Sequence, residues 1–294
     1  MVEALHLPYQ TEVVVLTVVP EHKFLGGITL DVIRGTTSAR KKAKAEQQQK
    51  ALELLQGTTR SLSWSKLKLE TLIRWGNPVE EILNLSNYGD ISLVIMGAKG
   101  LTDSLAFRLG NVALAVMKYA KTSVLLVRPK GASASKATRA GEKRAIINRV
   151  LLANDGSKYS DRAAQVLLDI PLPRRSEVIV ITALQSHLAA WVKTPTLDFQ
   201  TNQEILAKLQ AAEESEAQRI TAKSEKRFQA KGYKTASVVI RGGAAESILA
   251  ASKEYGTDII AVGSKGLTGI ESLLLGSVAE RIARHANCSV LIGR

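Results

Sequence analysis

The chain has 294 residues, of which 45% are hydrophobic and 23% charged, so it has the composition of a globular protein with room for two domains. No segment approaches the roughly 20 apolar residues of a membrane helix, and Met1–Ala4 has no signal-peptide character, so we expect a cytoplasmic protein without a membrane partner. The formal charge of +13 invites a nucleic-acid role, but only 4% of the residues are aromatic, too few for a base-stacking platform.

In the first half of the chain, short aliphatic segments predict strands at Val13–Thr17, Leu93–Met96 and Val124–Val127. The only dense basic run, Arg40–Lys44, lies on a predicted helix. A solvated helix face explains this run better than a DNA-binding element does, and we expect no nucleic-acid partner. Small and polar residues then predict a linker over residues 131–147.

The second half alternates predicted strands and helices, as a doubly wound parallel sheet requires. The predicted strands are Val150–Ala153, Val178–Thr182, Thr235–Ile240, Asp258–Val262 and Ser289–Ile292. The predicted helices run from the Ser157 turn through Leu168, over Asn202–Lys231, over Ala244–Tyr255 and over Ser277–His285. The single cysteine, Cys288, is expected to be a buried structural residue, and the four histidines show no metal-ligand spacing, so no metal site is predicted.

The two halves are copies of one unit. Glycines at the same spacing recur within Met96-Gly-Ala-Lys-Gly-Leu-Thr102 and Val262-Gly-Ser-Lys-Gly-Leu-Thr268, each followed by a third glycine. The matched glycines are Gly97, Gly100 and Gly110 in the first copy and Gly263, Gly266 and Gly276 in the second. The first copy has no counterpart of Val150–Asp155, so it is expected to lack its first strand and most of its first helix. A gap of this kind would leave Val13–Thr17 and Leu93–Met96 without a shared neighbour, and either the two edges close on each other or something else fills the gap.

The repeated glycines form a candidate phosphate cradle. Gly263 follows a predicted strand at the carboxyl edge, where ligands bind in open α/β sheets. Gly263 and Gly266 are expected to take positive φ and to bring backbone N–H groups close to an anion. Ser277 is expected to be the N-cap of a helix that offers further N–H groups, and Lys265 to add a mobile cation. The alternative is that the glycines serve only two tight turns.

At this point the chain resembles the universal stress proteins. The shared features are Gly-x-x-Gly, a nine-residue gap, Gly-Ser, a Val-Ala-Glu-Arg helix, a strand after His-Ala-Asn-Cys, and an Asp-Gly-Ser turn after the first strand. The resemblance covers the whole chain as a tandem member. It implies two Rossmann-like α/β domains of strand order 3-2-1-4-5, the first incomplete over residues 1–130 and the second complete over 148–294.

The family also implies ATP, with or without Mg²⁺, between strands 1 and 4. Asp155 would approach the ribose and adenine, Ala183, just past the second strand, would offer backbone groups to the base, and the second-copy glycines and Ser277 would hold the phosphates. The first copy keeps its three glycines and has Asn111 in place of Ser277. Because it lacks the aspartate and the whole strand, it is not expected to bind ATP.

These features favour an ATP-binding stress-response or signalling protein that acts through nucleotide occupancy. No catalytic residue is predicted, since no base or metal-binding carboxylate pair accompanies the glycines, and turnover would be weak hydrolysis at most. The alternative is a nucleotide-free interaction scaffold. In either case the last strands of the two copies, near Val124–Val127 and Ser289–Ile292, are expected to pair within the chain. The sequence does not decide whether the protein also forms a homodimer.

Overall fold

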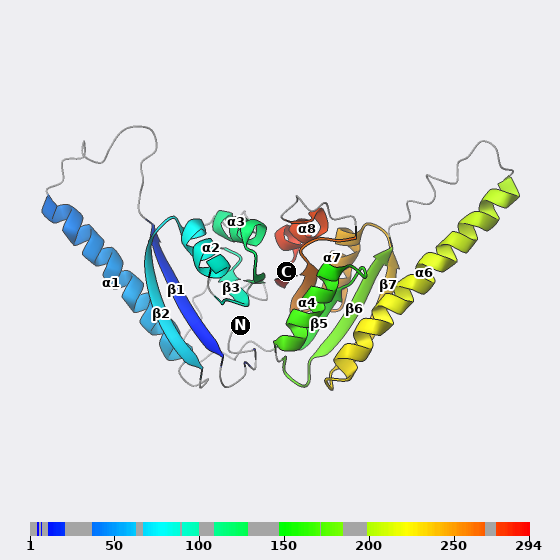
Figure 1. Ribbon diagram of the computed structural model, residues 1–294, viewed down its shortest axis with the longest axis horizontal. Helices are drawn as coiled ribbons and strands as arrows, with labels where there is room; N and C mark the ends of the chain where they lie inside the picture. Colours follow the sequence, from blue (N-terminus) through cyan, green and yellow to red (C-terminus); the bar gives the residue numbers. More distant parts are fainter. Residues whose placement is uncertain are drawn as a thin grey trace. The chain divides into compact units, whose positions relative to one another are not determined.

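The computed structural model describes residues 5, 7, 11–20, 37–62, 67–88, 90–99, 109–128, 147–170, 172–184, 199–267 and 275–294. These residues fall into two compact units, one of residues 7–91 and one of residues 1–6 with 92–294. Figure 1 shows the elements of both. None of the described helices has the length and apolar character needed to cross a membrane.

The smaller unit is built on two parallel strands, β1 (Glu12–Pro20) and β2 (Lys68–Gly76). They are joined through α1 (Thr37–Leu62), which contacts both strands, and followed by α2 (Pro78–Tyr88). The basic run Arg40–Lys44 therefore lies on a helix, as predicted. The Lys44 ammonium lies 4.8 Å from the centroid of the Trp75 ring of β2, a favourable cation–π contact.

The larger unit has a seven-stranded sheet of order β3-β4-β9-β8-β5-β6-β7. Its strands are β3 (Leu93–Gly97), β4 (Ser123–Val127), β5 (Arg149–Ala153), β6 (Glu177–Leu184), β7 (Lys234–Arg241), β8 (Ile259–Gly263) and β9 (Ser289–Gly293). Neighbours are parallel except β4 and β9. The five strands of the second repeat thus stand in the predicted order 3-2-1-4-5, and the sequence direction reverses at β5.

Helices cover both faces of this sheet and bury its inner strands β4, β9, β8 and β5 on both sides, whereas the edge strands β3 and β7 are partly exposed. On one face, α4 (Lys158–Asp169) packs on β8 and β9, and α6 (Phe199–Gln229) packs on β6 and β7. On the other face, α7 (Ala244–Glu254) and α8 (Ser277–His285) contact each other (Figure 1). In the first repeat, α3 (Asn111–Tyr119) contacts β4. Cys288, at the start of β9, is buried as predicted.

The sheet of the first repeat is divided at the missing strand. Among the described residues, β1 pairs only with β2, and β3 pairs only with β4. The two edges therefore do not pair with each other, and no described strand joins them. In the second repeat the equivalents of these strands, β6 and β8, both pair with β5, and residues 1–128 contain no counterpart of β5.

The last strands of the two repeats pair within the chain, as predicted. β4 and β9 run antiparallel, with Val124 opposite Ile292 and Leu126 opposite Val290. Two arginines at equivalent repeat positions close this junction in the same way. The guanidinium of Arg128 donates to the carbonyl of Ala283 at the end of α8, and that of Arg294 donates to the carbonyl of Met117 at the end of α3. Each arginine places its cation at the negative end of a helix of the other repeat, which is electrostatically favourable.

Glycines fix how closely α4 approaches the sheet. A Cβ at Gly263 would lie 2.6 Å from the carbonyl carbon of Tyr159, and one at Gly293 would lie 2.4 Å from the Cα of Ala163. The two glycines are neighbours across β8 and β9. The first-repeat counterpart of Gly293 is Val127.

Candidate nucleotide site

The candidate site lies at the carboxyl ends of β5 and β8, where the strand order reverses. β5 ends in a turn in which Gly156 has φ +81°. Ser157 is the N-cap of α4, and its side chain accepts a hydrogen bond from the backbone N–H of Ser160 at 3.2 Å. One oxygen of Asp155 accepts from the Ser157 N–H at 3.0 Å. The turn therefore fixes where the half-buried carboxylate of Asp155 is presented.

Asn154 is a positioning residue that the sequence analysis did not single out. It is 3% exposed, and its side-chain oxygen accepts from the Gly156 N–H at 2.8 Å and from the Ser160 hydroxyl at 2.7 Å. Its side-chain nitrogen donates to the Ser224 hydroxyl of α6 at 2.6 Å. A polar residue directly after an aliphatic strand and before Asp-Gly is the only sequence signal for this role.

The structure brings Asp155 and the glycine loop together. The second carboxylate oxygen of Asp155 accepts a hydrogen bond from the backbone N–H of Leu267 at 3.1 Å. A Cβ at Gly266 would lie 2.9 Å from the same oxygen. A side chain at Gly266 would therefore force the Asp155 carboxylate to shift. The prediction of positive φ at Gly263 and Gly266 is wrong, since neither adopts it.

Gly263 and Gly276 shape the loop through backbone packing. Gly263 is the last residue of β8 and lies under the first turn of α4. The N–H of Gly276 donates to the carbonyl of Ser264 at 2.7 Å, which closes the loop onto α8. The first repeat closes in the same way, from the N–H of Gly110 to the carbonyl of Ala98 at 2.8 Å. Residues 268–274 and Gly100 lie outside the described residues.

α8 spans the predicted residues, but its N-cap is one residue earlier than predicted. Gly276 is the N-cap, with extended φ −76° and ψ 153°, and Ser277 is the first helical residue. Gly110 and Asn111 have the same relation at the start of α3, so Asn111 is not the N-cap either. The reason is that loop closure already fixes the glycine at the cap position. The N–H groups of the first turn of α8 remain oriented as helix N-termini orient them toward anions.

Lys265 and Ala183 also lie at this edge of the sheet. The Lys265 ammonium is 5.5 Å from the ring centroid of Tyr159, in the first turn of α4. Ala183 was predicted to lie just past the second strand. It lies instead within β6, which extends to Leu184. The Ile181 carbonyl accepts from Asn154 at the end of β5. Backbone N–H and C=O groups alternate in direction along a strand, so those of Ala183, two residues after Ile181, point in the same direction as those of Ile181. They lie beyond the end of β5, where no described residue of that strand pairs with them.

Together these residues form a surface suited to a phosphate-bearing ligand with a polar sugar. It offers the backbone amides of a glycine loop, a helix N-terminus, a cation and one carboxylate acceptor. Among the described residues, no group of three or more His, Cys, Asp or Glu side chains could hold a metal ion. A side chain at position 266 would collide with the Asp155 carboxylate.

Comparisons with known proteins agree with the duplicated fold. The model of the universal stress protein family matches residues 1–128 and again residues 147–294. The universal stress protein Mb2028c of Mycobacterium bovis is 26% identical over 229 residues, covering 78% of this chain and 70% of the relative. MJ0531 of Methanocaldococcus jannaschii is 30% identical over 147 residues, covering 50% of this chain and 82% of the relative.

A solved structure shares the fold over almost the whole chain. The universal stress protein of Archaeoglobus fulgidus covers 97% of this chain and 86% of its own, with a TM-score of 0.57 and 21% sequence identity.

Proposed function

The chain belongs to the universal stress protein family, and from this premise we propose that it binds ATP in its second repeat and acts in the cytoplasm in a stress response or in signalling. One observation carries the proposal: the Asp155 carboxylate contacts the loop at Gly266 and Leu267. That contact sets an acceptor suited to a ribose hydroxyl beside the backbone suited to phosphates.

Each residue of the site has a separable task in this proposal. Asp155 would hold the ribose, and the backbone of Ala183 would face the base. The loop at Gly266, with Gly276 and the first turn of α8 at Ser277, would surround the phosphates, which Mg²⁺ can accompany. Lys265 is the mobile cation of the site. Gly263 acts indirectly, because it lets α4 and the Asp155 turn approach β8.

We propose that the site acts by binding ATP and not by hydrolysing it. Bound ATP would bridge the end of β5 and the start of α8, two segments that a short turn and a loop connect to the sheet. A ligand that binds only the ordered arrangement stabilises it by mass action. Nucleotide level would thereby set the fraction of molecules with an ordered loop.

The first repeat is expected to bind no nucleotide, because it has no equivalent of Asp155 or of the strand that carries it. Titration of the 294-residue protein with ATP in a calorimeter should therefore give one site per chain. A stoichiometry near two would contradict this assignment, and the absence of saturable binding would contradict the nucleotide proposal as a whole.

A nucleotide-free scaffold is the second candidate, and the pairing of β4 with β9 favours it. That pairing joins the two repeats through backbone hydrogen bonds that need no ligand. The titration separates the two candidates, since a scaffold would show no ATP binding while keeping the same fold.

A further inference from the structure

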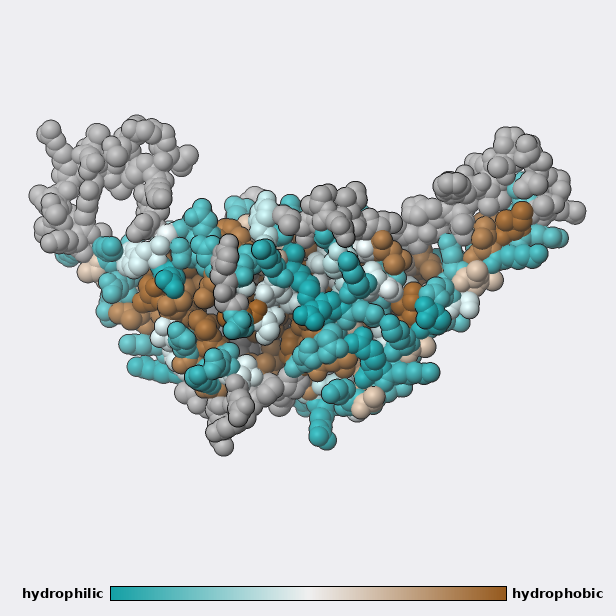
Figure 2. Space-filling view, in the orientation of Figure 1, coloured by the Kyte–Doolittle hydropathy of each residue, from teal (hydrophilic) through white to brown (hydrophobic). Residues whose placement is uncertain are grey.

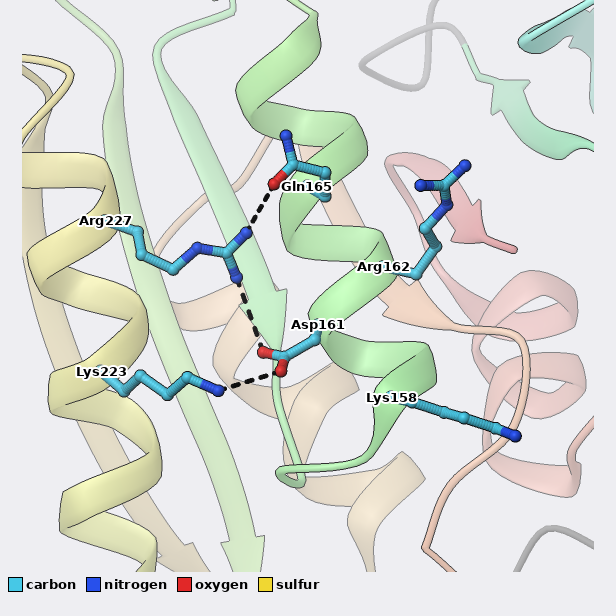
Figure 3. Close-up of a pocket in the computed structure, with 6 residues that line it drawn as sticks. All are labelled: Lys158, Asp161, Arg162, Gln165, Lys223 and Arg227. Carbon is cyan, nitrogen blue, oxygen red and sulfur yellow. Dashed lines mark hydrogen bonds and ion pairs between the residues drawn. The ribbon is translucent and has the colours of Figure 1, made fainter.

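A second, cationic groove lies on the outer side of α4 and α6, on elements that also support the nucleotide site. It has a volume of about 370 Å³ and is lined by Lys158, Asp161, Arg162, Gln165, Lys223 and Arg227. Figure 2 shows that the face of the molecule over α4 is largely hydrophilic. In Figure 3, Lys223 and Arg227 reach from α6 toward Asp161 and Gln165, while Lys158 and Arg162 project from the other side of α4.

The groove has more positive charge than its own carboxylate can neutralise. Asp161 contacts the Lys223 ammonium at 3.0 Å and the Arg227 guanidinium at 3.6 Å. Arg227 also donates to the side-chain oxygen of Gln165 at 2.8 Å. One carboxylate thus holds two cations side by side. Since four cations and one carboxylate line the groove, its formal charge is three positive charges.

Lys158 has no ion-pair partner among the described residues. The Lys158 ammonium lies 5.2 Å from the Tyr159 ring centroid. Arg162 uses one N–H on a main-chain oxygen of Arg294, the last residue of the sequence, at 2.7 Å, and its guanidinium has four further N–H donors. Lys158 is also the first residue of α4, where the helix dipole disfavours a cation. Helix stability therefore does not explain this lysine, and residues that break a local rule are expected at functional positions.

From this geometry we propose that the groove binds a short linear oligophosphate, either free or as the phosphate chain of a nucleotide. The cations lie on both sides of the exposed face of α4, so an extended anion crossing the helix reaches both groups, whereas a single phosphate reaches one. Guanidinium groups bind phosphate oxygens through paired N–H donors, and ammonium groups add point charges. A chain of three phosphates carries at least the three negative charges needed to neutralise the groove.

The test is calorimetric titration with sodium tripolyphosphate in a Gly266→Val background, so that the nucleotide site does not contribute. The double variant Lys158→Gln/Arg162→Gln leaves the ion pairs of Asp161 with Lys223 and Arg227 in place and should bind tripolyphosphate at least about tenfold more weakly. The matched control is Lys208→Gln/Lys253→Gln, which removes the same charge from exposed positions outside the groove. Its affinity should stay within about twofold, because long-range charge is largely screened in salt.

ATP titrated into the same variants identifies the source of the phosphates. If ATP binds in the Gly266→Val background and the groove variant weakens that binding, the groove accepts the phosphate chain of a nucleotide. If tripolyphosphate binds and ATP does not, the groove accepts only the free chain. Equal weakening in the groove and control variants would overturn the proposal, because it would reduce the effect to net charge. Absence of saturable tripolyphosphate binding before the charge substitutions would overturn it as well. None of these outcomes depends on whether the Gly266 site binds ATP.

Discussion

Gly266→Val is expected to remove ATP binding while leaving the fold of the larger unit in place. The added Cβ would lie 2.9 Å from the Asp155 carboxylate, which also accepts the Leu267 N–H. The side chain would displace the carboxylate and the loop amide together. Loss of one charge-assisted hydrogen bond costs about 1.5–3 kcal/mol, or roughly 10- to 100-fold in affinity. The branched side chain also takes up space that the phosphates need, so the total loss should exceed this range and leave no measurable binding.

The duplication supplies the control for this variant. Gly100→Val makes the same change at the equivalent position of the first repeat, which has no aspartate equivalent to Asp155. Calorimetry should show wild-type affinity for Gly100→Val and no measurable binding for Gly266→Val, with unchanged circular dichroism in both. Full ATP affinity in Gly266→Val would reject the assignment of the loop, and loss of binding in Gly100→Val alone would move the site to the first repeat.

Gly263→Ala is expected to destabilise the larger unit strongly. Its Cβ would lie 2.6–2.8 Å from backbone atoms of Tyr159 and Ser160, which cannot rotate away as a side chain can. Relief requires a shift of the first turn of α4 against β8. Overpacking of this kind costs about 1–3 kcal/mol or more, and a rigid backbone contact puts the cost near 3 kcal/mol. For a unit of this size the midpoint of thermal unfolding should fall by roughly 6–12 °C.

Gly97→Ala is the matched substitution in the first repeat. Among the described residues, the nearest atom to the added Cβ is the carbonyl oxygen of Lys99, at 3.1 Å, and no helix backbone lies within 4 Å. A shift of a few tenths of an ångström in the loop relieves this contact, so the loss should stay below about 1 kcal/mol. Equal thermal shifts for the two variants would show that close packing of α4 does not explain Gly263.

The strands and helices of the second repeat could be read from the sequence because their signals are local. Aliphatic runs bounded by Gly, Asp or Ser predict buried strands, and α8 begins and ends at the predicted residues, Ser277 and His285. The pairing of β4 with β9 could be expected because both are short aliphatic strands at sheet edges.

The roles of individual glycines could not be read in the same way. A glycine in sequence suggests positive φ, but Gly263 and Gly266 are required by close approach of α4 and of Asp155, respectively. Both approaches join residues more than a hundred positions apart, so no local pattern records them. Asn154 was missed for the same reason, since its partner Ser224 lies on α6. The sequence shows that residues 1–128 contain no counterpart of β5. It left open whether β1 and β3 would pair with each other or whether another segment would lie between them.

The most direct test of the account is hydrogen–deuterium exchange of the 294-residue protein with and without saturating ATP. We predict slower exchange with ATP in peptides that cover residues 153–160, 263–267 and 277–280, the two sides of the proposed site. The equivalent first-repeat segments, residues 97–99 and 111–114, should exchange at the same rate in both conditions. The account would be contradicted if ATP slowed exchange in the first-repeat segments as much as in the second-repeat segments. It would also be contradicted if ATP did not slow exchange around Asp155 and Gly266.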